Sequence, residues 1–189
     1  MSDPGPGTRI SMLERDQVTP ELGSLYDALL AQRGVVPNMF KTVAHTPGLA
    51  LAFAGFLKAL LSDGALKGWY KELIATRMSV LLGSSYAVTA HSLSARQKGA
   101  TEEQIAAVKN NLDHGPFSEE EKLGLHCADR IHHSATEVDD AFFAKLKQVF
   151  DDQEIVELTA TACAFEFFPR FVDALRIPTT PPPAAGKKG

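Results

Sequence analysis

The sequence is short of cysteine, of clustered positive charge and of long apolar runs. Its two cysteines, Cys127 and Cys163, are compatible with a reducing compartment. A net charge of −4 with scattered lysine and arginine provides no basic face for nucleic acid. No apolar run is long enough to span a bilayer, and the first residues lack the apolar core of a signal peptide. We therefore expect a soluble, cytoplasmic protein that binds neither nucleic acid nor membrane.

Strand signals, glycine-rich phosphate loops and internal repeats are also missing. Apolar residues recur instead at helical spacing along the chain, as in Leu22, Leu25, Tyr26, Leu29 and Leu30. The pattern predicts an all-α fold. The apolar run at 155–168 predicts a last helix that is central and buried, which Pro169 kinks or ends.

Composition predicts one domain with a substantial core, since 44% of the 189 residues are hydrophobic and 22% are charged. We place this domain at residues 10–177. Residues 1–9 and 178–189 are rich in proline, glycine and small side chains, and are expected to be flexible tails.

Several helix starts carry capping signals. Thr101 with Gln104, and Ser118 with Glu121, have the form of capping boxes. An aspartate at 139 or 140 is placed to cap one later helix, and an aspartate at 151 or 152 the next.

The segment at 72–99 holds four residues of interest: Glu72, Ser84, Ala87 and His91 are separated by twelve, three and four positions. In one straight helix Glu72 and His91 would be roughly 28 Å apart. Gly83, followed by two serines, predicts a turn that folds His91 back towards Glu72. A meeting across a subunit interface is the second route.

This spacing resembles the carboxymuconolactone decarboxylase and alkylhydroperoxidase D-like family. The stretches at 34–53, 99–105 and 154–178 are also similar to it, so the resemblance covers roughly residues 10–177. It implies a helical bundle with a two-helix core motif, a small-molecule substrate and assembly as a trimer or hexamer. In the family's peroxidase branch, the positions that match Ser84 and Ala87 are cysteines.

The missing thiols bear on the chemistry. Reducing a peroxide with a dithiol needs one thiolate to attack oxygen and a second thiol to resolve the sulfenate. Ser84 and Ala87 can do neither. Cys127 and Cys163 are expected to be buried hydrophobic residues on separate helices.

The retained acid and imidazole favour proton transfer, such as decarboxylation or isomerisation of a small organic acid or lactone without a cofactor. His91 is the candidate acid or base. Glu72 would orient its ring or act as the partner carboxylate. Ser84, Ser85 and Tyr86, at the start of the second helix, would offer donors to an oxyanion. Ala87 and Glu166 complete the predicted substrate pocket.

Simpler interpretations stay open for each residue. Glu72 could be a solvated helix residue and His91 a structural histidine. Tyr86 could pack its ring in the core. Glu166 could form an ion pair with Arg170 one turn later, or face the motif helix as a pocket acid.

A polar stripe on one later helix allows a metal site as a weaker alternative. His126, Asp129 and His133 lie at i, i+3 and i+7, which is also typical of a solvated helix face. We predict no metal.

Three functions follow in order. The first is a cofactor-free decarboxylase or isomerase that uses Glu72 and His91. The second is a catalytically inactive, oligomeric binding or scaffold protein. The third, a peroxidase, requires Cys127 or Cys163 to be exposed and activated.

Overall fold

The computed structural model describes residues 7–182, which form helices and no strand. This confirms the predicted all-α class. None of the described helices is long and apolar enough to cross a membrane. The α-helices are α1 (Pro20–Arg33), α2 (Asn38–Val43), α3 (Pro47–Leu61), α4 (Gly68–Leu81), α5 (Ser85–Lys98), α6 (Glu102–Asn110), α7 (Glu119–His133), α8 (Asp140–Val149) and α9 (Asp152–Ala174). Short 3-10 turns lie at Arg15–Gln17, Leu112–His114 and Ala135–Glu137.

The chain forms two compact units. The described part of the first unit comprises residues 7–58 and 172–182, and the second comprises residues 59–171.

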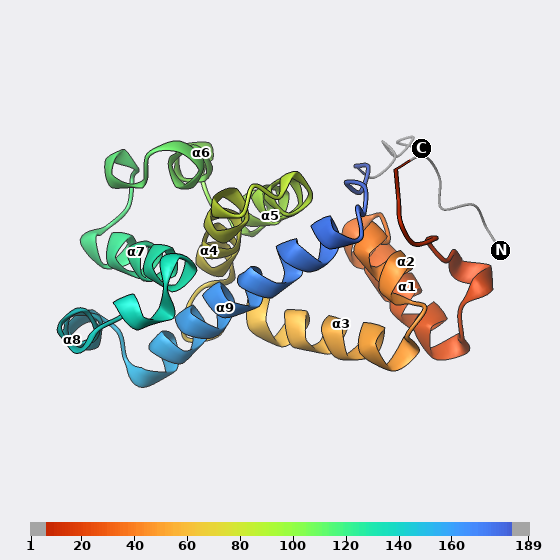
Figure 1. The fold of residues 1–189 in the computed structure, drawn as a ribbon, viewed down its shortest axis with the longest axis horizontal. Coiled ribbons are helices and arrows are strands. Elements are labelled where there is room, and N and C mark those ends of the chain that lie inside the picture. Colours follow the sequence, from red (N-terminus) through yellow and green to blue (C-terminus); the bar gives the residue numbers. More distant parts are fainter. Residues whose placement is uncertain (1–6, 183–189) are drawn as a thin grey trace. The chain divides into compact units, whose positions relative to one another are not determined.

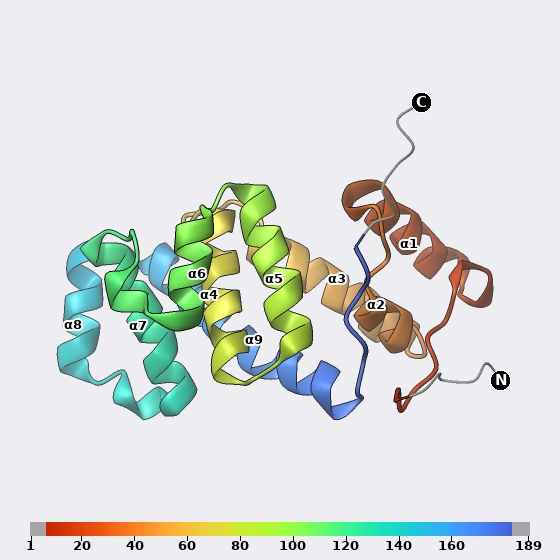
Figure 2. The same ribbon diagram turned by 90° about the horizontal axis from the view of Figure 1, so that it is seen from above.

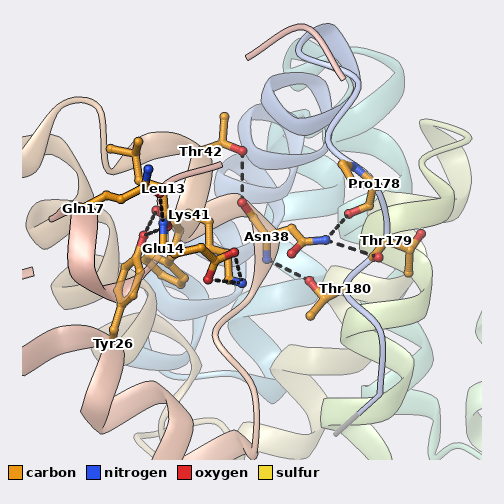
Figure 3. Close-up of polar contacts among 11 residues, drawn as sticks. Leu13, Glu14, Gln17, Tyr26, Asn38, Lys41, Thr42, Pro178, Thr179 and Thr180 are labelled. Atoms are coloured by element: carbon orange, nitrogen blue, oxygen red, sulfur yellow. Dashed lines mark hydrogen bonds and ion pairs between the residues drawn. The ribbon is translucent and has the colours of Figure 1, made fainter. Parts of the chain in front are cut away.

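In the first unit, Asn38 at the start of α2 holds the segment that follows α9 (Figure 3). Its side-chain amide donates to the Pro178 carbonyl at 3.0 Å, and its backbone N–H donates to the Thr180 hydroxyl at 2.9 Å. Residues 178–180, assigned from the sequence to a tail, are therefore hydrogen-bonded. Residues 1–6 and 183–189 of the predicted tails lie outside the described residues.

In the second unit, α4 and α5 form a helical hairpin and lie side by side (Figures 1 and 2). Gly83, with φ of 70°, adopts the left-handed conformation that ends α4. The N–H of Ser84 then donates to the Ser79 carbonyl at 3.0 Å, as in a Schellman motif. The turn predicted at Gly83 is confirmed.

The predicted caps are also present. Thr101 and Ser118 each accept a hydrogen bond from the backbone N–H three residues later, at 3.1 Å, and both capping boxes are complete. Asp139 caps α8, and Asp151 accepts from the N–H of Glu154 at the start of α9 at 2.8 Å. Local hydrogen-bonding chemistry therefore sets these boundaries.

The most buried helix of this unit is α4, which packs against α5, α6 and α7. Leu73, Ile74 and Met78 are fully enclosed, and so are the charged side chains of Lys71 and Glu72 at 1% exposure each. Burying two adjacent charges requires a partner for each.

The expectation that the last helix is buried nearly all round was wrong. Val156 and Phe167 on α9 are 66% and 49% exposed, whereas Leu158 and Phe165 are fully buried. Of the two effects predicted for Pro169, a kink or an end of the helix, the end does not occur, because α9 continues to Ala174. An apolar run alone does not reveal which face a helix buries.

Tyr70 and Gly124 provide a test of the packing between α4 and α7. The Tyr70 hydroxyl donates to the Glu121 carbonyl at 2.6 Å, and a Cβ at Gly124 would lie 2.4 Å from that hydroxyl oxygen. We expect Gly124→Ala to lower the free energy of unfolding by about 1–3 kcal/mol in urea denaturation. Gly55→Ala is the control, because no atom lies within 4 Å of its added Cβ. It should leave stability unchanged or raise it by up to about 1 kcal/mol; equal effects of both changes would contradict this account.

Candidate functional site

The site is organised around the Glu72 carboxylate, which lies in the middle of α4 and is 1% exposed. One oxygen, Oε2, lies 2.7 Å from His91 Nδ1 on α5. The other, Oε1, accepts a hydrogen bond of 2.6 Å from Lys98 Nζ. The turn at Gly83 thus brings Glu72 and His91 together within one chain, and the simpler interpretation of Glu72 as a solvated helix residue was wrong.

His91 lies between the carboxylate and an aromatic ring. The imidazole packs edge-on against Phe165 of α9, with 4.4 Å between ring centroids, and its side chain keeps 18% exposure. An ionised Glu72 can only accept, so Nδ1 of His91 must carry the proton in this pair. In the neutral ring, Nε2 then holds the free lone pair and is the nitrogen that can exchange a proton with a substrate.

Lys98 is the site residue that sequence reasoning missed. It is the last residue of α5, and its Nζ also donates to the Leu61 carbonyl at the end of α3, at 2.7 Å. The available signal was its spacing of seven residues from His91, which puts both side chains on the same face of α5.

Glu72 is held ionised in spite of its burial. Desolvation, the largest single influence, raises the pKa of this carboxyl. The hydrogen bonds and positive charges of His91 and Lys98 outweigh desolvation and bring the pKa below its ordinary value. A carboxylate that stays ionised while almost free of solvent is a strong and fixed hydrogen-bond acceptor.

The other predicted pocket residues lie nearer the start of α5. Ser84, Tyr86 and Ala87 are buried, whereas Ser85 is exposed. Ser84 occupies the N-cap position, but its side chain makes no capping hydrogen bond. Ser85 precedes His91 by six residues, or roughly 9 Å along the helix axis. The hydrogen-bond donors at the N-terminal end of α5 can therefore contact only a substrate that extends roughly 9 Å from the imidazole.

Glu166 belongs to a second cluster of similar design. It accepts from His132 Nδ1 of α7 at 2.6 Å and from the Arg170 guanidinium at 2.7 Å. The ion pair with Arg170, one of the two interpretations of Glu166, is present. His132 was a second partner that the sequence did not reveal, because it lies on a different helix.

The two cysteines differ from each other. Cys127 is buried, and burial raises its pKa to about 11. Cys163 is exposed, so the expectation that both thiols are buried was wrong for this residue. Desolvation, with a smaller contribution from Glu166, still raises the Cys163 pKa, which is the opposite of activation.

The polar stripe on α7 does not converge on one point. His126 binds Asp113 at 2.8 Å and lies 3.9 Å from Asp129, which pairs with Arg77. His133 lies 3.6 Å from Glu137 instead. Within the described residues, no three histidine, cysteine or carboxylate side chains are grouped to hold a metal ion.

Together these features define a small α-helical protein with an acid–imidazole–ammonium cluster at a helical hairpin. Residues 47–117, which contain that hairpin, match the Carboxymuconolactone decarboxylase family. This match confirms the predicted resemblance to the family over the part of the chain that carries the acid and the imidazole.

The chain is also similar to known proteins in sequence and in fold. Uncharacterized protein YnjA of Escherichia coli (strain K12) is 28% identical over 145 residues, which cover 77% of this chain and 75% of YnjA. The alkylhydroperoxidase AhpD core structure of an uncharacterized peroxidase-related protein from Ralstonia eutropha JMP134 has a TM-score of 0.86, with 23% identity over 93% of both chains.

The debrominase Bmp8 shares the same fold. Its structure has a TM-score of 0.79 at 22% identity and covers 95% of this chain and 94% of Bmp8. A cysteine-to-alanine variant of Bmp8 was solved in complex with 2,3,4-tribromopyrrole. At this level of identity the likeness establishes the fold alone.

The depressed pKa of Glu72 predicts a defined pH dependence. Because its folded pKa lies below the ordinary value of 4.5, the ionised carboxylate stabilises the fold above about pH 4.5, and this contribution is lost as pH falls through the folded pKa. Glu72→Gln should therefore lower the free energy of unfolding by about 1–3 kcal/mol at pH 7, and by less at pH 4. Urea denaturation at several pH values measures this. Glu103→Gln, a change at an exposed carboxylate of α6, is the control and should show little change. A Glu72→Gln effect that grows in acid would contradict the assignment.

The raised thiol pKa values predict low reactivity. In iodoacetamide labelling at pH 7.5, Cys163 should react no faster than a free cysteine peptide. Cys127 should react only after unfolding in urea, because its side chain is enclosed. Cys163→Ser should abolish labelling of the folded protein. Faster labelling of Cys163 than of the peptide would instead indicate an activated thiol and favour the peroxidase hypothesis.

Proposed function

We propose that this protein is an enzyme that catalyses cofactor-free proton transfer, as in decarboxylation or isomerisation, on a small organic acid or lactone. The observation that carries the proposal is the 2.7 Å pair of His91 with a fully buried Glu72. Burial makes the carboxylate an acceptor of fixed position, and the imidazole is the side chain best suited to exchange protons near neutral pH.

The pair supplies both halves of an isomerisation. His91 Nε2 takes a proton from the carbon next to a carbonyl, and the electron pair of that C–H bond moves into an enolate. The resulting imidazolium is stabilised by Glu72 through Nδ1–H. Nε2–H then returns the proton to a different carbon, so that the enzyme ends in its starting state.

Decarboxylation uses the second half alone. When the C–C bond to the carboxylate breaks, its electron pair stays on the substrate and carbon dioxide leaves. His91 in its protonated form delivers the Nε2 proton to that carbon, and is reprotonated from water. Phe165, which packs against the ring, limits the directions from which a substrate can approach Nε2.

A binding or scaffold role is the alternative, favoured by the serine and alanine at the positions of the two cysteines of the family's peroxidase branch. Assembly as a trimer or hexamer and a cytoplasmic location stay predictions. The dithiol peroxidase is the weakest candidate because burial raises the pKa of both cysteine thiols.

A screen of keto acids and lactones tests the proposal. We expect His91→Gln to lower kcat/KM by about 10²–10⁴-fold on any substrate that the wild type converts, because that is the usual contribution of general acid–base catalysis. His114→Gln, a change at an exposed histidine of the same unit, should have no effect. Activity that is indifferent to His91 would contradict the mechanism, and a folded protein inactive on every compound would favour the binding role. A parallel assay with cumene hydroperoxide and a dithiol should show no turnover.

A further inference from the structure

The Lys98 side chain is held by two hydrogen-bond acceptors from different helices. Its ammonium group bridges the Leu61 carbonyl, at 2.7 Å, and Glu72 Oε1, at 2.6 Å. The carbonyl comes from the last residue of α3, where the C-terminal carbonyls of a helix lack intrahelical partners. The lysine therefore satisfies a helix end and a buried carboxylate at once.

Gly68, the first residue of α4, makes room for this arrangement. A Cβ at this position would lie 2.9 Å from the Leu61 carbonyl oxygen and 3.3 Å from Lys98 Cδ. The N–H of Gly68 is fixed by Asp63 Oδ1 at 2.7 Å. A side chain at residue 68 would crowd both partners, so the passage for the lysine chain depends on a glycine.

Lys98 and His91 are bound to the two oxygens of a single carboxylate. In this three-residue cluster, Lys98 and His91 are the side chains that can be positively charged, and Glu72 is the negatively charged one. From the other elements packed here, α9 presents the uncharged Phe165 ring and α3 presents the Leu61 carbonyl. The segment between α3 and α4 adds one more carboxylate, Asp63, which interacts with the charge of Lys98. A positive charge on one of the two side chains makes a positive charge on the other less favourable, because both interact with the same buried carboxylate.

We propose that Lys98 is a positioning residue that serves as the permanent counter-ion of Glu72, so that His91 is free to stay neutral with Nε2 open as a proton acceptor. Without the ammonium, the buried carboxylate would have the imidazole as its remaining counter-ion, and would hold the ring in its doubly protonated form. That form cannot accept a proton. The catalytic meaning of this role rests on the isomerisation form of the proposed function, in which His91 first accepts a proton, but the role itself is a property of the resting protein.

The protonation state of His91 tests the proposal without any substrate. In ¹⁵N-labelled protein at one fixed pH, long-range ¹H–¹⁵N spectra distinguish the neutral ring from the ring that carries protons on both nitrogens. The His91 signals are assigned by their loss in His91→Gln. We expect Lys98→Met to lower the ratio of neutral to doubly protonated His91 by about tenfold, as expected when one charge is removed beside a shared, partly desolvated partner.

Matched variants separate this effect from a general loss of charge. Lys98→Arg keeps the positive charge and should keep the ratio within about twofold of the wild type. Lys145→Met removes a charge from the exposed face of α8 and should leave the ratio unchanged. Circular dichroism checks that each variant is folded. Should Lys98→Met fail to fold, Lys98→Gln removes the charge and keeps a hydrogen-bond donor, and the same shift is expected.

An unchanged ratio in the folded Lys98 variants, or an equal change in Lys145→Met, would overturn the proposal. Because the readout needs no turnover, its failure is distinguishable from failure of the proposed function. If the ratio shifts but the protein converts no substrate, the role of Lys98 as the counter-ion of Glu72 is supported and only the proposed chemistry is rejected.

Discussion

The second unit of this protein is organised by one buried carboxylate that is shared between the His91 imidazole and the Lys98 ammonium. Glu72 lies on α4, the most enclosed helix of that unit, and without partners its desolvation would favour the neutral acid. His91 and Lys98 reverse that preference. Both come from α5, so the ionised state of Glu72 depends on the hairpin being closed. The contacts that form the site therefore also hold α4 and α5 together.

Lys71, the residue before Glu72, is a second buried charge on α4 that needs a partner, and its partner lies on α9. Lys71 is 1% exposed, and its ammonium donates to Glu157 of α9 at 2.9 Å. Glu157 also accepts from the backbone N–H groups of Ala65 and Leu66, which lead into α4. Two adjacent buried charges on α4 thus point to two different helices. A rotation or shift of α4 would leave both uncompensated, at a cost of several kcal/mol for each buried pair. This constraint keeps Glu72 in the register that meets His91.

Much of the local structure could be predicted from the sequence because local chemistry determines it. Gly83 ends α4 because glycine tolerates a positive φ, and Thr101 and Ser118 begin helices because their hydroxyls accept from the first-turn N–H groups. Other features depended on contacts that no local pattern encodes. Cys163 and Phe167 lie in an apolar run but are exposed, because the face of α9 that is buried depends on how the other helices pack against it. Lys98 reads as an ordinary basic residue at a helix end, and its partner is a carboxylate 26 positions away.

The sequence by itself determined the helical class, the turn that reverses α4 into α5, and the absence of thiols between the acid and the imidazole. These properties follow from side-chain identity and from spacings within a few turns. Only the tertiary structure decided that Glu72 is removed from water, that Lys98 shares it with His91, and that Glu166 is shared between His132 and Arg170. The reason is that desolvation and charge pairing act between groups distant in sequence, and their balance exists only once the helices have packed.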